Sequence, residues 1–242
     1  MLLDCWFKYH PPNHNNKSVE HVAVEDAMAL ERSRLLEILK RTSYRESETP
    51  IYHLASGIDS KYYIDCKYAL SDPEARDCLA TVVVKMLGNT AMDAIGGLEL
   101  GAYPIAISIS DKIYKNTGKK IRVFVVRKDQ KKHGNTSLIA GDARRGDRVL
   151  IVDDVITSGG SAIKAIAAAR DAGLKVEQVV AMVDREESDG RKNIEALGVR
   201  FHPIFTLNDL KSFDGPGNKN KVPKPDQKRT LRRQSSRVAA AS

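Results

Sequence analysis

Short apolar segments recur along the second half of the chain, and amphipathic or polar stretches separate them. Branched apolar residues fill the short segments, which predicts strands, whereas the amphipathic stretches have helical spacing. The predicted strands cover residues 94–96, 121–126, 149–152, 176–183 and 199–205. Strands that alternate with helices indicate a parallel sheet with right-handed crossovers. Such a sheet binds its ligand beyond the carboxyl ends of its strands, so we expect the site at that edge.

The first half of the chain has a different pattern. Residues 22–41 predict an amphipathic helix, and two β-like runs follow at residues 51–54 and 62–65, around a Ser-Gly turn. Pro73 occupies the first-turn position of another predicted helix, which extends to about Leu87.

Both ends of the chain lack apolar periodicity, and we expect them to be disordered. The N-terminal arm covers residues 1–21, and a basic tail covers residues 211–242. We expect one folded domain between them, at residues 22–210. Its helix and small leading segment occupy residues 22–70, and its α/β core occupies residues 71–210.

The formal net charge of +8 on 242 residues is concentrated at one end of the chain. Eight basic residues and a single acid lie between residues 215 and 242, so the rest of the chain is nearly neutral. This distribution describes a tail rather than a binding face, and we expect no nucleic-acid partner. No window has the roughly 18 apolar residues of a membrane span, so we expect no membrane either. Three cysteines without a pairing pattern indicate a reducing, cytoplasmic location.

The sequence VLIVDDVITSGGSA, at residues 149–162, places two carboxylates, Asp153 and Asp154, where an apolar strand leaves the core. A loop of Thr, Ser and Gly follows, and then a helix, so the backbone N–H groups of the loop form an anion cradle. Vicinal sugar hydroxyls would donate hydrogen bonds to the two carboxylates. A sugar phosphate therefore fits both the carboxylate pair and the anion cradle. The structural alternative, a strand end capped by an Asp turn, explains one aspartate better than it explains a pair.

The sequence RKDQKKHG, at residues 127–134, follows the preceding predicted strand and carries four cations and one histidine. A charge run of this kind is usually a solvated loop. Here it reaches the same edge of the sheet as the aspartates, where cations would neutralise charge on a departing group. A loop this long inside a compact domain is commonly a lid.

These two motifs resemble a known family. VLIVDDVITSGGSA is similar to the phosphoribosyl-pyrophosphate (PRPP) signature of type I phosphoribosyltransferases, and RKDQKKHG to the catalytic loop of the orotate phosphoribosyltransferases. HLASGIDSKYYID, GGLELGAYPIA and VDREE are similar, more weakly, to the N-terminal, pyrophosphate-binding and base-recognition segments of that group. The resemblance covers roughly residues 22–210.

The resemblance implies an α/β, type I phosphoribosyltransferase fold, with a central parallel sheet flanked by helices and a small N-terminal hood. It implies transfer of phosphoribosyl from PRPP to orotate, giving orotidine 5′-monophosphate and pyrophosphate, in pyrimidine (UMP) biosynthesis. Mg²⁺ would arrive bound to PRPP or pyrophosphate, without a dedicated metal site in the protein. The implied assembly is a homodimer whose active sites are shared across the interface.

The resemblance also assigns residues. Catalytic roles go to Lys131, His133 and Asp154. Binding of PRPP is assigned to Arg127, Lys128, Lys131, His133, Asp153, Asp154, Val155, Ile156, Thr157, Ser158, Gly159, Gly160 and Ser161. Binding of orotate is assigned to Thr157, Arg185, Tyr63 and Ile64. A surface salt bridge with Glu186 or Glu187 is the alternative for Arg185, and packing between the small segment and the sheet is the alternative for Tyr63 and Ile64.

Two departures from the family pattern bear on the substrate. Some members have Lys where this chain has Ala55, and some have Lys in the pyrophosphate loop, where GLELGAYP has none. These departures leave a phosphoribosyltransferase for adenine or another base as a competing hypothesis. A regulator that senses PRPP without turnover is a separate alternative, but it would normally have a DNA-binding domain or an impaired loop, and neither is seen in the sequence. Arg185 and the His133-Gly134 pair favour orotate, because its carboxylate needs a cation.

Overall fold

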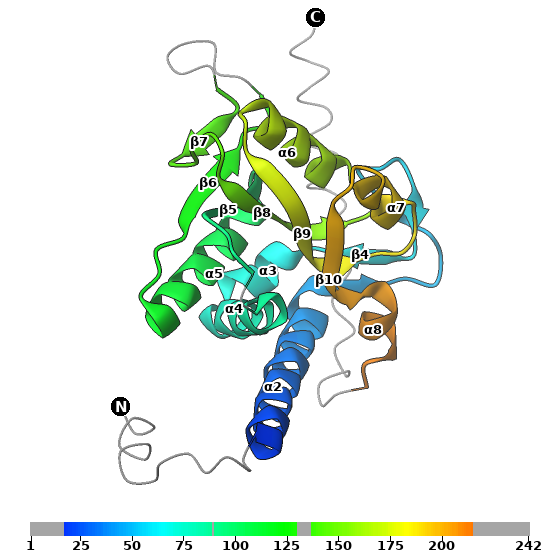
Figure 1. The fold of residues 1–242 in the computed structure, drawn as a ribbon. Coiled ribbons are helices and arrows are strands. Elements are labelled where there is room, and N and C mark those ends of the chain that lie inside the picture. The colour runs from blue at the N-terminus through cyan, green and yellow to red at the C-terminus, as the bar shows by residue number, and fades with distance from the viewer. Residues whose placement is uncertain (1–16, 89, 130–136, 215–242) are drawn as a thin grey trace, which may run out of the picture.

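A six-stranded sheet forms the centre of the protein in this computed structural model, which describes residues 17–88, 90–129 and 137–214 (Figure 1). Five strands are parallel, and the last one pairs antiparallel to its neighbour at the edge. In spatial order the strands are β10 (Arg200–Thr206), β9 (Lys175–Asp184), β8 (Arg148–Ile156), β5 (Ala94–Leu98), β6 (Arg122–Val126) and β7 (Ile139–Gly141). The predicted parallel sheet is confirmed. Strand β7, which lies between the predicted strands at residues 121–126 and 149–152, was not expected.

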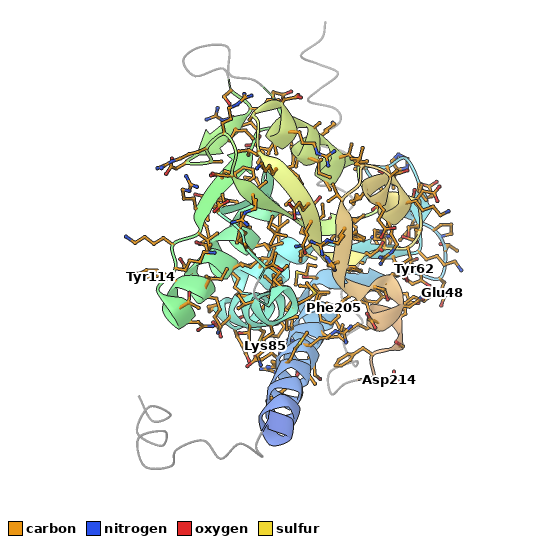
Figure 2. All side chains as sticks on the ribbon, in the orientation of Figure 1. Glu48, Tyr62, Lys85, Tyr114, Phe205 and Asp214 are labelled. Atoms are coloured by element: carbon orange, nitrogen blue, oxygen red, sulfur yellow. The ribbon has the colours of Figure 1, made fainter. Side chains whose placement is uncertain are left out.

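Helices cover both faces of the sheet, and each face has its own hydrophobic core. The larger core holds α2 (Lys17–Ser43), α3 (Cys66–Ser71), α4 (Pro73–Leu87) and α5 (Ala102–Thr117) against one face. The smaller core holds α6 (Gly160–Asp171) and α7 (Gly190–Glu195) against the other. The last helix, α8 (Leu207–Ser212), follows β10 and adds Leu207 and Leu210 to the larger core. Phe205, labelled in Figure 2, is fully buried there, with the Arg32 guanidinium carbon 4.7 Å from its ring centre.

Local residues fix the ends of these helices. Asp72 caps α4 by accepting a 2.9 Å hydrogen bond from the Glu74 N–H, and Pro73 is the first helical residue, as expected. Gly118 ends α5 in the left-handed conformation, with φ of 71°. Helix α2 starts at Lys17, five residues before the expected position, so the expected N-terminal arm is partly helical. Polar residues continue a helix readily, but they leave no apolar periodicity by which to detect it.

Four short strands form a small hood between α2 and α3. Strand β1 (Tyr44–Glu46) pairs antiparallel with β4 (Tyr62–Ile64), and β2 (Tyr52–His53) pairs antiparallel with β3 (Asp59–Ser60). The two β-like runs of the sequence thus each contain a strand, with partners that the pattern did not indicate. Among the described helices, none is long and apolar enough to cross a lipid bilayer.

Candidate active site

The paired aspartates lie inside strand β8, which continues to Ile156 rather than ending at residue 152 as expected. On one side β8 pairs with β9 along its whole length, through Ile156 and Asp184. On the other side its pairing with β5 ends at Gly96 and Ile151. The last part of β8 therefore projects past β5 and leaves an open edge beside the aspartates. The longer strand also corrects the expected exposure, because Asp153 is only 5 % exposed, whereas Asp154 is half-buried.

Asp153 is a buried carboxyl with an unused oxygen. Its Oδ1 accepts a 3.0 Å hydrogen bond from the Asp154 N–H, but its Oδ2 is buried and has no hydrogen-bond partner among the described residues. Burial, and secondarily the negative charge of Asp154, raise the pKa of Asp153 well above its usual range. Asp154 has one oxygen engaged by the Val155 N–H, at 3.0 Å. Both carboxyls can therefore accept hydrogen bonds from a bound ligand.

The loop after β5 passes directly against Asp154. A Cβ atom at Gly101 would lie 2.5 Å from the Asp154 carboxyl carbon, and one at Gly97 would overlap the Val152 carbonyl oxygen. Only glycine lets the backbone come this close. The peptide bond between Glu99 and Leu100 in this loop is cis. The loop carries no cation, and its Glu99 carboxylate accepts a 3.0 Å hydrogen bond from the Lys128 N–H.

Residues 157–161 lead from β8 into α6 and present the expected anion cradle. Within the described part of the chain, none of the N–H groups of Thr157, Ser158, Gly159, Gly160 and Ser161 donates to a protein acceptor. Gly159 adopts a left-handed φ of 80° as the cap of α6, a helix of 12 residues whose dipole favours an anion at this end.

Helix α7 holds the cradle from the far side. The Asn193 side-chain amide donates to the Ser158 carbonyl at 3.0 Å, and a Cβ atom at Gly190 would overlap the Thr157 carbonyl oxygen. Ile156 was expected to bind PRPP, but its side chain is buried in the smaller core and its carbonyl accepts from the Arg185 N–H at 2.9 Å. Val155 is half-buried and packs against the larger core, so these two residues position the cradle from beneath.

Arg185 follows β9 and is almost fully buried, with 2 % of its surface exposed. Its Nε and Nη2 atoms pair with Glu187 Oε2 at 2.9 and 2.5 Å, and Nη2 also donates to Ser60 Oγ at 3.0 Å. Ser60 in turn donates to Glu187 Oε1 at 2.6 Å, which ties the hood to the turn after β9. Glu187, the alternative partner expected for Arg185, is thus its actual partner, but their ion pair is buried rather than on the surface. The Nη1 nitrogen makes no hydrogen bond to the described residues, and it remains available to a ligand.

The structure separates Tyr63 from Ile64, which were both expected along the base. They are neighbours on β4, so their side chains point to opposite faces. Ile64 is buried in the larger core, where packing between the hood and the sheet accounts for it. Tyr63 is 41 % exposed and stacks on Tyr52, with ring centres 5.5 Å apart. Of these two residues, only Tyr63 has a side chain that could line the site.

The basic segment begins at the carboxyl end of β6. Arg127 holds its own loop by donating from Nη1 to the Ser137 carbonyl at 3.0 Å. Lys128 is exposed, and Lys131 and His133 lie outside the described residues. Because β5, β6, β8 and β9 are parallel, the loop before Gly101, the described start of the basic segment, the aspartates and Arg185 all occupy one edge of the sheet, as expected.

Three contributors to this region were not singled out from the sequence. Ser60 holds Arg185, Glu99 holds the Lys128 backbone, and Lys67 lies near Asp154. All three act through contacts between segments far apart in sequence. The stretches HLASGIDSKYYID and GGLELGAYPIA contain Ser60 and Glu99, but no pattern marked either residue by itself.

Known proteins are similar to this chain in sequence and fold. The family model described as "Phosphoribosyl transferase domain" matches residues 75–207. The chain is 40 % identical to an orotate phosphoribosyltransferase of Aquifex aeolicus over 183 residues, which covers 76 % of this chain and 99 % of the relative. A Leptospira biflexa orotate phosphoribosyltransferase is 39 % identical over 182 residues, 74 % of this chain and 97 % of its own. The crystal structure of Mycobacterium tuberculosis orotate phosphoribosyltransferase in complex with PRPP is similar, with a TM-score of 0.60, 32 % identity, and 75 % and 99 % of the two chains covered.

Proposed function

Because this chain belongs to the orotate phosphoribosyltransferase family, we propose that its site transfers phosphoribosyl from PRPP to orotate. The products are orotidine 5′-monophosphate and pyrophosphate, in pyrimidine biosynthesis. One observation carries the proposal: the aspartate pair of β8 leads directly into a cradle of unpaired N–H groups at the start of α6. Hydroxyl acceptors beside an anion cradle match a sugar phosphate.

The reaction breaks the bond between the ribose anomeric carbon and pyrophosphate and forms one to a ring nitrogen of orotate. Positive charge develops on the ribose, and negative charge develops on the leaving group. Asp153 and Asp154 hold the ribose hydroxyls and stand near the positive charge. The N–H groups of residues 157–161 hold the 5-phosphate, and the glycine loop ending at Gly101 accommodates the pyrophosphate.

Orotate carries a carboxylate that needs a cation. The free Nη1 of Arg185 supplies one on the hood side of the site, with its guanidinium fixed by Glu187. Thr157 and Tyr63 lie along the base. A base without a carboxylate would leave this buried cation without a partner on the ligand side, which favours orotate over adenine.

Four residues of the basic segment, Arg127, Lys128, Lys131 and His133, close over the pyrophosphate. Lys131 is the leading candidate for the catalytic lysine and His133 for a second catalytic group. These assignments come from the family motif. They are supported by the position of Arg127 and Lys128 at the shared edge of the sheet.

Mg²⁺ accompanies the pyrophosphate. Carboxylate oxygens are ligands that Mg²⁺ prefers, and Asp154 presents one beside the pyrophosphate loop. The described residues contain no group of three His, Cys, Asp or Glu side chains that could hold a metal ion, so pyrophosphate and water would supply most ligands. The ion would neutralise charge on the leaving group.

The functional unit is a homodimer located in the cytoplasm. Leu100, Tyr103 and Ile107, at the pyrophosphate loop and the first turns of α5, are 74 %, 47 % and 37 % exposed, which supports burial against a second copy. Light scattering behind a sizing column tests this assembly, and a purely monomeric species at micromolar concentration would contradict it.

A panel of bases tests the function. The protein is incubated with PRPP, Mg²⁺ and, separately, orotate, uracil, adenine, hypoxanthine or guanine, and nucleotide and pyrophosphate are measured. We expect orotidine 5′-monophosphate from orotate alone. Turnover of a purine would support the other-base hypothesis, and binding of PRPP without any turnover would support the sensor.

A further inference from the structure

Lys67 is a cation at the start of α3, which packs on β8 near Asp154, and the reaction described above does not use it. It occupies the first turn of α3, and its side chain is 61 % exposed. The preceding residue anchors it, because the Cys66 sulfur lies 3.8 Å from the Asp154 carbonyl oxygen. The start of α3 is thereby fixed against the part of β8 that carries the aspartates.

Only part of the Lys67 ammonium is used by the protein. Its Nζ pairs with Asp65 Oδ1 at 2.6 Å, and an ammonium has three N–H donors. Asp65 has a second task that does not need this ammonium, since its carboxylate caps α3 by accepting from the Lys67 N–H at 3.1 Å. Partial burial opposes the charge of Lys67, but the hydrogen bond and charge of Asp65 and the charge of Asp154 raise its pKa. Lys67 is therefore cationic at neutral pH.

The glycine loop contributes no positive charge of its own at the end of the site next to Lys67, so the cations there come from the basic segment and from Lys67. The loop that touches Asp154 at Gly101 contains Glu99 and no cation. The 5-phosphate cradle lies at the other end, where Gly190 and Asn193 of α7 border it. An anion bound near Lys67 is thus the group at the opposite end of the sugar.

We propose that Lys67 binds the pyrophosphate group of PRPP, and that it supplies the cation which the glycine loop lacks. This inference rests on the proposed function. Pyrophosphate carries several negative charges, and the nearby carboxylate of Asp154 repels them. A charge-assisted contact from the ammonium compensates for this repulsion.

Three variants test the assignment: Lys67→Gln, Asp65→Asn and Lys112→Gln. Lys112 is a matched control, because its ammonium pairs with Asp77 at 2.9 Å on the outer side of α4 and α5. Loss of a hydrogen bond to a charged group is worth about 1.5–3 kcal/mol, or roughly tenfold to hundredfold in affinity. We expect Lys67→Gln to raise the KM for PRPP by about tenfold or more and to leave the KM for orotate within about twofold. In the reverse reaction, the KM for pyrophosphate should rise and that for orotidine 5′-monophosphate should not.

The controls separate binding from structure. Asp65→Asn keeps a capping side chain and frees the ammonium, so it should not reproduce the rise. Lys112→Gln should leave all constants unchanged, and Lys67→Arg should restore most of the PRPP affinity. An unchanged KM for PRPP in Lys67→Gln, or an equal rise in Asp65→Asn, would overturn the inference, as would a rise confined to orotate.

The failure of the proposed function is a separate outcome. If the unmodified protein forms no nucleotide from orotate, that function is wrong. Calorimetric titration of PRPP and Mg²⁺ into the unmodified and Lys67→Gln proteins then tests Lys67 directly. Equal affinities would overturn the inference. Thermal melts of all variants identify any loss of folding, and Lys67→Met, which also removes the charge, serves as the test if Lys67→Gln does not fold.

Discussion

Replacing Asp153 by Asn should stabilise the protein at neutral pH while impairing its activity. The Asp153 carboxyl is 5 % exposed, and its Oδ2 has no partner among the described residues. Burial, and then the charge of Asp154, raise the pKa of Asp153 above its ordinary value of 3.8. The ionised side chain is therefore a source of instability in the ligand-free protein, tolerated because the ribose needs an acceptor.

The expected change in the free energy of unfolding follows from these contacts. An unsatisfied buried polar group costs about 1–3 kcal/mol, and an ionised group costs more. Asn keeps the Oδ1 acceptor for the Asp154 N–H, and its own amide nitrogen lacks a partner but carries no charge. We therefore expect Asp153→Asn to raise the free energy of unfolding by about 1–2 kcal/mol at pH 7.5. For a protein of this size, that corresponds to a Tm increase of about 2–8 °C.

The stabilisation expected for Asp153→Asn should depend on pH. A carboxyl whose pKa is raised by folding stabilises the folded state fully below its unfolded pKa, near 3.9, and that contribution is lost as pH rises through the folded pKa. The Tm advantage of the variant should therefore be largest at neutral pH and should shrink as the pH falls toward 4.

Urea unfolding and thermal melts of both proteins, at several pH values between 4 and 8, measure this difference. Asp184→Asn is the matched control. Asp184 is equally buried, but its carboxylate accepts from the Glu186 N–H at 3.1 Å and pairs with Arg191 at 3.4 Å. Its substitution should destabilise the protein. A destabilised Asp153→Asn, or an advantage that does not depend on pH, would refute the reasoning.

Three further predictions concern turnover. Gly101→Ala places a methyl group 2.5 Å from the Asp154 carboxyl carbon, so kcat/KM should fall by about 100-fold with the fold retained. Activity within about threefold of normal would show that the loop can move away from Asp154. Arg185→Gln should raise the KM for orotate by about tenfold or more and leave the KM for PRPP unchanged, as measured by varying each substrate. A rise in both KM values would indicate instead that the hood has lost its attachment to Glu187. Lys131→Ala should lower kcat by at least about 100- to 1000-fold without changing the Tm, and near-normal turnover would remove Lys131 from its catalytic role.

The alternating strands, their parallel pairing and the edge that carries the site could all be predicted from the sequence. Apolar residues buried on both faces form continuous runs, such as the one before Asp153, and these runs report a central parallel strand directly. Pro73 and Gly118 mark helix ends through local backbone geometry, which needs no tertiary information. The loop of residues 157–161 was placed between β8 and α6 for the same reason, because adjacent residues remain adjacent, whereas the aspartates lie inside β8 and not at its end.

Features that depend on distant segments could not be predicted. The pattern of branched apolar residues gave no reason to end β8 as late as Ile156, because the added pairing comes from β9. It also could not tell which of Tyr63 and Ile64 faces the core, because that depends on how β4 packs against the larger core. The buried bond network of Arg185 joins residues more than 120 positions apart, and no local motif encodes it.

A crystal structure of the protein with PRPP and Mg²⁺ bound would locate the sugar phosphate. We expect the ribose hydroxyls on the carboxyls of Asp153 and Asp154, and the 5-phosphate on the N–H groups of residues 157–161. A sugar ring bound away from the two aspartates, or a 5-phosphate held outside that cradle, would contradict this expectation.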